Sequence, residues 1–376
     1  MAYCAGAALG LVGNFFNRLK LFSKVLIVMA LTFPQILKAQ KITTPIGLNN
    51  EQLPVLPKEF YVAGVTDERD DRNAIAWLLP PGKTAGKYSV DLKGGTLAAI
   101  KQFINFTWPP NKVLRPVIMH IKKFRLDESL LPGGNVEGRV SVTLSFYLQK
   151  DEGSIQLIDY TGSAGYSRPA EQQADAEPIL RHALEHGLIY FNTWINREAD
   201  TNIKLAKSVR LIFTDYTEQP EGDTVYYSGK RPLRWDDFRA KPEGGKYEAE
   251  VFPSIGYNEE VEVVKGIVNV HLSVKAYVPK SACWVKDGSR NAYSLNHEQR
   301  HFDIVKIIAE HFKKNLKAEK FTVDNYDGPV GAVYLESFHE MNVMQEQYDN
   351  ETSHGTNPYA QQQWNEKIDK ELGGKK

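Results

Sequence analysis

The chain has 376 residues, of which 42% are hydrophobic and 11% aromatic, enough for the packed cores of two globular domains. Its 46 basic residues balance its 46 acidic residues. Because the chain has no net positive charge to attract nucleic acid or an anionic membrane surface, we expect no nucleic-acid partner. The charge leaves the class of substrate open.

The first forty residues have the pattern of an export signal. Three basic residues precede the apolar run 25–33, and Ala39 supplies a small residue for cleavage before Gln40. The run is too short to span a bilayer, and no second stretch of membrane length follows it. We therefore expect residues 1–39 to be a signal peptide and the mature protein to be periplasmic or extracellular, without stable membrane insertion.

The region from residue 53 to 202 alternates between strand-like and helix-like patterns. Apolar patterning predicts strands at 60–65, 74–79, 117–124 and 140–148, and helical spacing predicts helices at 96–106 and 177–195. The Pro-Gly-Gly-Asn sequence at 132–135 supplies a turn between the last two strands. This layout predicts an α+β module. It resembles modules that accompany envelope transport systems, so we expect a cell-envelope partner for it.

Two histidines of the 177–195 helix have metal-ligand spacing. His182 and His186 are four residues apart on one face, but Glu185 precedes His186 and no glutamate directly follows His182. We interpret both as exposed residues of the helix surface.

A polar stretch at 216–226 follows a short strand predicted at 209–213. We place a domain boundary near residues 200–222. It divides the chain into an N-terminal α+β module of unknown role, 40–205, and a C-terminal domain, 206–376.

The C-terminal domain begins with strand patterns at 254–257, 261–264 and 267–278, the last two joined by a Lys-Gly turn. Cys283 is the one cysteine outside the predicted signal peptide, so no internal disulfide is possible. Its place beside Trp284 is typical of a small buried residue rather than a nucleophile.

Residues 297–301, His-Glu-Gln-Arg-His, have the pattern of a zinc-hydrolase helix. His297 and His301 are four residues apart, so a helix projects both imidazoles toward one ion. Glu298 then lies beside the open side of the ion, as the general base for a zinc-activated water. Ser294 or Asn296 is suited to cap the helix. The alternative is an exposed amphipathic helix with two solvated histidines.

The sequence HEQRHFDI at 297–304 resembles the signature of bacterial predicted secreted zinc-dependent proteases, the DUF922 family. Three further segments match in order, LRWDDF at 233–238, SACWV at 281–285 and YDNETSHG at 348–355, and Gln361 and Trp364 follow. The similarity covers about residues 222–372. It implies a zinc peptidase-like domain and leaves the substrate open.

A catalytic zinc needs a third protein ligand. We expect His354, because the adjoining Gly355 and the Asn-Pro pair at 357–358 favour a loop that returns across the helix. The His-Gly pair also matches the resembled family. Rival ligands are Glu336, His339 and Glu340, on a helix predicted at 332–345, and Glu351 in the segment that follows it.

Other side chains are candidates for supporting roles. Asp303 either orients a ligand imidazole or lies on the surface. Tyr348 or Tyr359 is the candidate catalytic donor of a hydrogen bond to the oxyanion. Trp235 and Phe238 are expected to pack beneath the zinc helix.

The fold class expected is α+β, with the N-terminal module followed by a zincin-like catalytic domain. The function expected is a Zn²⁺-dependent metallopeptidase that hydrolyses peptide bonds in a peptide or protein substrate. The same chemistry also cleaves amides of cell-wall peptides. The alternative from another class is a non-catalytic envelope protein with a structural or vestigial zinc site.

Overall fold

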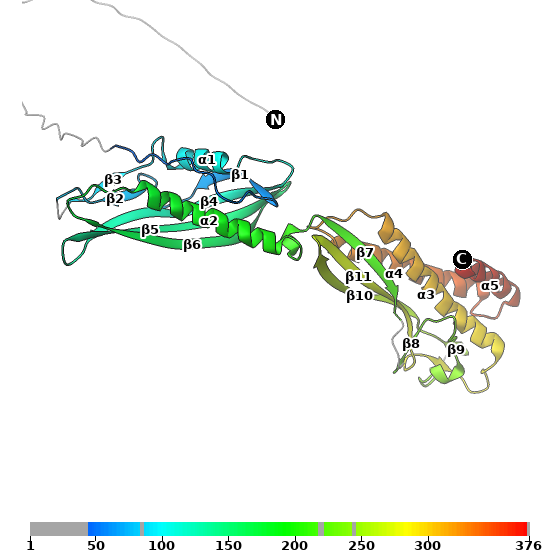
Figure 1. Ribbon diagram of the computed structural model, residues 1–376. Coiled ribbons are helices and arrows are strands. Elements are labelled where there is room, and N and C mark those ends of the chain that lie inside the picture. Colours follow the sequence, from blue (N-terminus) through cyan, green and yellow to red (C-terminus); the bar gives the residue numbers. More distant parts are fainter. Residues whose placement is uncertain (1–43, 83–85, 217–221, 243–245, 374–376) are drawn as a thin grey trace, which may run out of the picture. The chain divides into compact units, whose positions relative to one another are not determined.

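A computed structural model describes residues 44–82, 86–216, 222–242 and 246–373 (Figure 1). The predicted signal peptide lies outside the described residues. Within these ranges helices and strands are both abundant, which confirms the α+β class. None of the helices in these ranges combines the length and the apolar character that a membrane span requires.

The first sheet has six strands, in the order β3-β2-β4-β5-β6, with β1 paired to β4. Their bounds are β1 (Phe60–Asp67), β2 (Ala76–Leu78), β3 (Tyr88–Val90), β4 (Arg115–Leu130), β5 (Asn135–Lys150) and β6 (Gly153–Pro169). β4, β5 and β6 are antiparallel neighbours, whereas β1 and β2 both run parallel to β4. The predicted turn joins β4 to β5, and Gly133 and Gly134 both have the positive φ that the turn requires.

Two helices accompany this sheet, α1 (Thr96–Thr107) and α2 (Glu177–Glu198), and a 3₁₀ turn follows at Ile203–Leu205. The predicted apolar stripe of α2 is buried, and Phe191 stacks on Phe146 of β5 with ring centroids 4.0 Å apart. His182 and His186 are exposed, which confirms that they belong to the helix surface.

The structure contains a long strand that the sequence patterns did not predict. β6 has 17 residues, rich in Gly, Ser and Tyr. Its inward positions include Gly162 and Ala164, whose small side chains hide the alternation of apolar and polar residues that identifies a strand.

The second sheet has the order β10-β11-β7, with β8 also paired to β11. Its strands are β7 (Ser208–Asp215), β8 (Thr224–Tyr226), β10 (Ser254–Val264) and β11 (Ile267–Pro279). The two strands predicted at 254–257 and 261–264 are one continuous strand. The hairpin turn is at the predicted place, and Lys265 and Gly266 have φ of 52° and 70°. A small separate sheet pairs β9 (Ala249–Glu250) with β12 (Trp284–Val285), and a 3₁₀ turn spans Trp235–Asp237.

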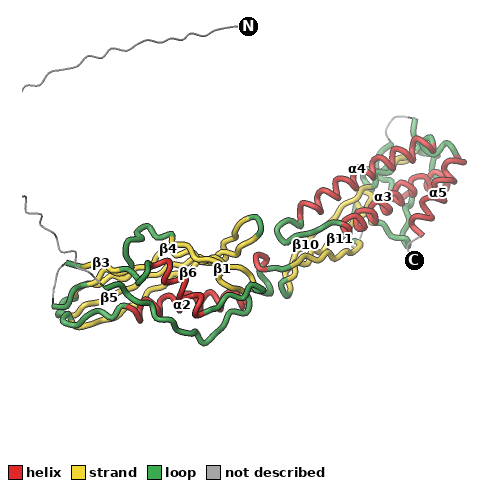
Figure 2. Tube along the Cα trace, turned by 90° about the horizontal axis from the view of Figure 1, so that it is seen from above, coloured by secondary structure: helices red, strands yellow, loops and turns green. Residues whose placement is uncertain are grey.

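Three helices complete the chain, α3 (Ala292–Ala318), α4 (Asp327–Thr352) and α5 (Pro358–Gly373), and each contacts the other two (Figure 2). The apolar face of α3 packs on β10 and β11. The start of α3 differs from the prediction, because Asn291 is the N-cap and its side chain accepts from the Ser294 amide at 2.9 Å.

Buried hydrophobic side chains form two clusters. The first draws on residues between Phe60 and Leu205, and the second on residues between Val225 and Ile368. The division of the chain into two domains at residue 205 stays a prediction.

Cys283 is free, fully buried and part of the second cluster, as its sequence setting indicated. Its thiol donates to the Pro279 carbonyl at 3.2 Å, and burial raises the pKa of the thiol to about 12.

Because the thiolate is the nucleophile, we predict that Ellman's reagent does not label Cys283 in the native protein at pH 8. One thiol per chain outside the signal peptide should react once guanidinium unfolds the protein. Rapid labelling of the native protein would contradict this placement.

Candidate metal centre

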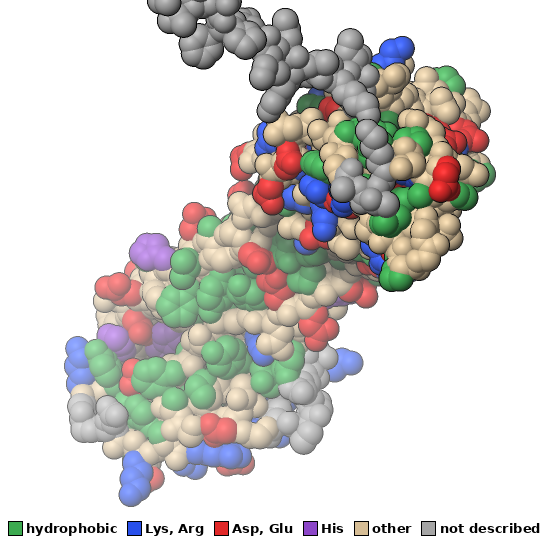
Figure 3. Space-filling view, turned by 90° about the vertical axis from the view of Figure 1, so that its left-hand side faces the viewer, with side chains coloured by type: hydrophobic (Ala, Val, Ile, Leu, Met, Phe, Trp, Pro, Cys, Tyr) green, Lys and Arg blue, Asp and Glu red, His purple; other side chains and the backbone are tan. Residues whose placement is uncertain are grey.

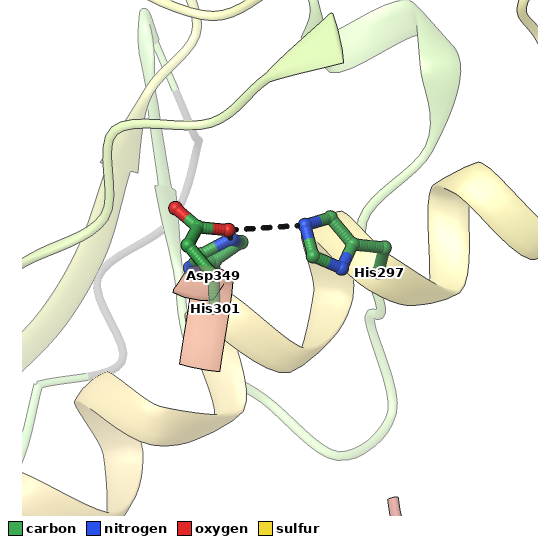
Figure 4. Close-up of side chains that lie close together, drawn as sticks. All are labelled: His297, His301 and Asp349. Atoms are coloured by element: carbon green, nitrogen blue, oxygen red, sulfur yellow. Dashed lines mark hydrogen bonds and ion pairs between the residues drawn. The ribbon is translucent and has the colours of Figure 1, made fainter. Parts of the chain in front are cut away.

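α3 and α4 bring two imidazoles and a carboxylate together. His297 and His301 lie one turn apart on α3, and Asp349 comes from the last turns of α4 (Figure 4). The Nε2 atoms of His297 and His301 are 3.3 Å and 3.0 Å from the same oxygen, Asp349 Oδ1. Both histidines are buried, and the carboxylate is half-buried. Among the described residues, this is the one group of three or more His, Cys, Asp or Glu side chains whose donor atoms converge.

The outer nitrogen of each ligand imidazole is held by a glutamine. His297 Nδ1 donates to Gln361 Oε1 of α5 at 2.9 Å, and His301 Nδ1 donates to Gln345 Oε1 of α4. Gln345 also donates from Nε2 to the His301 carbonyl at 3.0 Å. With Nδ1 protonated and occupied, the neutral tautomer of each ring leaves its Nε2 lone pair directed at the shared centre, as metal-binding histidines require.

This donor set fits a divalent metal ion. Two imidazole nitrogens and a carboxylate oxygen are common first-row metal ligands. In a tetrahedral zinc site with bonds of about 2.0–2.1 Å, ligand atoms lie roughly 3.3–3.4 Å apart. The two Nε2–Oδ1 separations, 3.3 Å and 3.0 Å, are close to that value. The group could therefore hold an ion with little movement.

The electrostatics of the group follow from its burial and its charges. Burial opposes ionisation of Asp349, but its hydrogen bonds to His297 and His301 outweigh burial and hold its pKa well below the usual range. Burial by itself lowers the pKa of His301, whereas the Asp349 carboxylate more than offsets this and raises it. In the absence of metal the carboxylate thus favours protonated imidazole, so protons compete with a metal ion for this site.

Glu298 lies next to the group, on the same helix. It is buried, and its Oε2 accepts a hydrogen bond from the Val251 amide at 3.0 Å. Burial raises the pKa of its carboxyl group, and the nearby His301 and His297 partly offset that rise. Glu298, both histidines and Asp349 all line one pocket of about 810 Å³. Glu298 therefore borders the same pocket as the three donor groups.

The structure brings Asp349, and not the expected His354, together with the two imidazoles. The His354 Nδ1 is 3.5 Å from Asp349 Oδ1, and its partly exposed ring lies against Tyr247 with centroids 4.2 Å apart. The predicted loop does return across α3, since a Cβ on Gly355 would lie 3.1 Å from the His297 ring. His354 thus borders the donor group without belonging to it.

The rival ligands also lie outside the donor group. Glu351 accepts from the Trp364 indole at 2.8 Å, Glu340 pairs with His311 at 2.8 Å, and Glu336 and His339 are exposed. The sequence carried a signal for Asp349, since it stands four residues after Gln345 on the same helical face. That signal was missed because the helix was predicted to end at residue 345.

Tyr348 lies beneath the histidines and not at the pocket. Its ring stacks on His297 with centroids 4.8 Å apart and is fully buried. Its hydroxyl donates to the His297 carbonyl at 3.2 Å and accepts from Gln361 Nε2 at 2.6 Å. The expected role as oxyanion donor has no support in this placement, because Tyr348 does not line the pocket and its hydroxyl already pairs with two groups. The other candidate, Tyr359, is exposed and does not line the pocket.

Asp303 is buried but contacts neither imidazole. It accepts from Tyr227 at 3.0 Å, from Gln299 at 2.8 Å and from Arg300 at 3.0 Å. Neither role that the sequence left open for Asp303 fits this placement: it is not on the surface, and Gln361 and Gln345, not Asp303, contact the imidazoles. Trp235 and Phe238 pack together in the second hydrophobic cluster with centroids 4.9 Å apart.

Comparisons with known proteins do not assign a family. No family model matches the chain, and no curated protein matches it. Among solved structures, the chain is similar to protein XCC0632 from Xanthomonas campestris, described as DUF330. The two sequences are 8% identical, and the structural match covers 42% of this chain and 99% of that one, with a TM-score of 0.27. It is also similar to a minor lipoprotein from Acinetobacter baumannii, with 14% identity, coverage of 36% and 91%, and a TM-score of 0.17. Values this low carry no functional argument, so the resemblance to secreted zinc-dependent proteases stays a prediction.

Replacing Asp349 or His354 separates the two candidate third ligands. We predict that Asp349→Ala loses bound metal and that His354→Ala keeps it, because only Asp349 shares the centre with both Nε2 atoms. Losing a direct ligand should weaken binding by more than the roughly 10- to 100-fold typical of an outer-shell change. Metal content after dialysis, measured by mass spectrometry, checks this. Retention by Asp349→Ala together with loss by His354→Ala would restore His354 as the ligand.

The glutamine contacts predict that zinc affinity falls, but is not abolished, when an orienting glutamine is replaced. Gln361→Leu removes the acceptor for His297 Nδ1, so zinc affinity measured by competition with a chelator should fall about 10- to 100-fold. Gln363→Leu, on the exposed side of the same helix, is the matched control and should leave affinity unchanged. Equal affinities for both variants and the wild type would show that Gln361 does not support the site.

Proposed function

We propose that this protein is a zinc-dependent metallopeptidase, with zinc held by His297, His301 and Asp349 and with Glu298 as the general base. The observation that supports it most is the convergence of both Nε2 atoms on Asp349 Oδ1 beside a buried glutamate, in one pocket. A helical His-Glu-x-x-His sequence without such convergence would carry little weight.

The choice of zinc rests on the donor atoms and their number. Two histidines and one carboxylate are a common protein ligand set for catalytic zinc, which keeps a further position open. The described residues supply three converging donors, and all three border the pocket. When bound, zinc polarises a carbonyl and brings the pKa of water to about 7.

Glu298 would take the proton from the attacking water and deliver it to the leaving amine. Its burial keeps the carboxylate out of bulk water, and a raised pKa brings it nearer to the working pH, which favours both transfers. The Val251 amide fixes one carboxylate oxygen and leaves the other to accept a proton.

Peptides are the favoured substrates because an extended segment forms one wall of the pocket. β9 pairs with β12, and the Lys286 amide donates to the Glu248 carbonyl at 2.9 Å. Backbone groups alternate in direction along a strand, so those of Ala249 and Val251 face the opposite side, where Val251 already meets Glu298. A peptide that adds along this side would place its backbone across the metal centre.

Action outside the cytoplasm is part of this proposal. It rests on the signal-peptide pattern of residues 1–39, which lie outside the described part of the chain.

Glu298→Gln tests the catalytic assignment. We predict that this variant keeps one equivalent of zinc but hydrolyses casein at least about 100-fold more slowly than the wild type, because the proton acceptor is lost and the ligands are not. Glu310→Gln, farther along α3 and paired with Lys306 and Lys313, is the control and should retain activity.

Zinc bound at full occupancy without hydrolysis of casein or broad peptide libraries would favour the non-catalytic envelope protein with a structural or vestigial site. A wild type that binds no metal would refute both the zinc site and the peptidase.

A further inference from the structure

The pocket has two ends, which are separated by the metal centre. Its walls are the segment from Lys246 to Ser254 and helix α4, and α3 supplies the histidines and Glu298. At one end the Tyr247 ring lies against His354. Beyond the other end the Tyr334 hydroxyl donates to the Ile255 carbonyl at 3.1 Å. The segment and α4 therefore run in opposite directions along the pocket.

The end toward Tyr334 is apolar. Phe252 and Pro253 line it from the segment, and Phe338 and Met341 line it from α4. Phe252 is 45% exposed and Phe338 is 38% exposed, although both are large hydrophobic residues. Single exposed hydrophobic residues are common, but several that line one pocket together are typical of a ligand-binding groove.

The other lining residues at this end, Ser254 and Asn342, are neutral, so the described lining residues from 252 to 254 and from 338 to 342 carry no formal charge. The nearest charged lining residue on the segment is Glu250, whose Oε2 accepts from the Trp284 indole at 3.2 Å. The opposite end differs, because Lys246, Glu248 and His354 line it. Hydrophobic side chains also gather on the surface beside histidines in the part drawn fainter in the space-filling view (Figure 3).

The apolar end lies within reach of a substrate bound at the metal. Met341 lies about two helical turns before Asp349, or roughly 12 Å along the axis. An extended peptide advances about 3.3 Å per residue, so this distance corresponds to about three or four residues.

We propose that Phe252, Pro253, Phe338 and Met341 form a specificity subsite for a bulky apolar side chain. The subsite selects peptides with Leu, Met or Phe about three or four residues to one side of the scissile bond. This inference rests on the proposed peptidase function and names its substrate class. The same pocket is lined by the donor residues and by the apolar end. The side chain that fills the apolar end therefore belongs to the substrate bound at the metal centre.

Cleavage profiling tests the subsite. The purified zinc-loaded protein is incubated with a randomised peptide library, and cleavage positions are read by mass spectrometry. The expected profile has one position enriched in Leu, Met and Phe and no apolar enrichment at the mirrored position. In Phe338→Ser and Phe252→Ser the preference for Leu over Ser at that position should fall about 10-fold or more. Leu335→Ser, an exposed residue of α4 that does not line the pocket, should keep it.

A binding measurement separates failure of the subsite from failure of the peptidase. Zinc-loaded Glu298→Gln is titrated into fluorescent peptides that carry Leu or Ser at successive positions, followed by anisotropy. Tighter binding of one Leu peptide, lost in the Glu298→Gln, Phe338→Ser double variant, supports the subsite even if the wild type cleaves nothing. Cleavage without apolar preference and equal affinities for all Leu and Ser peptides would overturn the subsite while leaving the peptidase in place.

Discussion

The contact of the Asp349 carboxylate with two imidazole nitrogens joins α3 to α4, and the geometry of the pocket depends on it. Each partner is costly to bury alone. A carboxylate removed from water needs a cation or hydrogen-bond donors, and imidazoles that face each other need an acceptor or an ion between them. Tyr348 and Gln361 supply the layer beneath, which holds the His297 backbone and ring in place. The site is therefore a set of mutually dependent buried polar groups and not two histidines on a surface helix.

The part of this site that could be predicted from sequence is the part encoded by one helix. The spacing of His297, Glu298 and His301 places them on α3 whatever the rest of the chain does. Asp349 and Gln361 come from other helices, and their positions depend on how α4 and α5 pack against α3. Helical periodicity reports a buried face but not the neighbour that covers it, so a nearby histidine in a loop motif seemed the better ligand.

For the fold as well, features marked by local sequence patterns were predicted and features without such patterns were missed. β1 was predicted near its observed bounds, and β4 was predicted near its start, although it continues to Leu130, past the predicted end at 124. The Lys265-Gly266 turn was predicted from local chemistry alone. β6 was missed because glycine and alanine stand where larger apolar residues usually mark the inward face. The extension of α4 to Thr352 was missed because its final turns are polar, and they are polar because they carry the site.

The chain order of the site has a consequence for biogenesis. Gln361, which orients His297, follows it by 64 residues, and Asp349 follows His301 by 48. A nascent chain that has emerged only as far as α3 carries the pentapeptide but neither the carboxylate nor the amide that direct its nitrogens. The complete group of donor atoms and orienting amides therefore forms only after α5 has been synthesised and has docked.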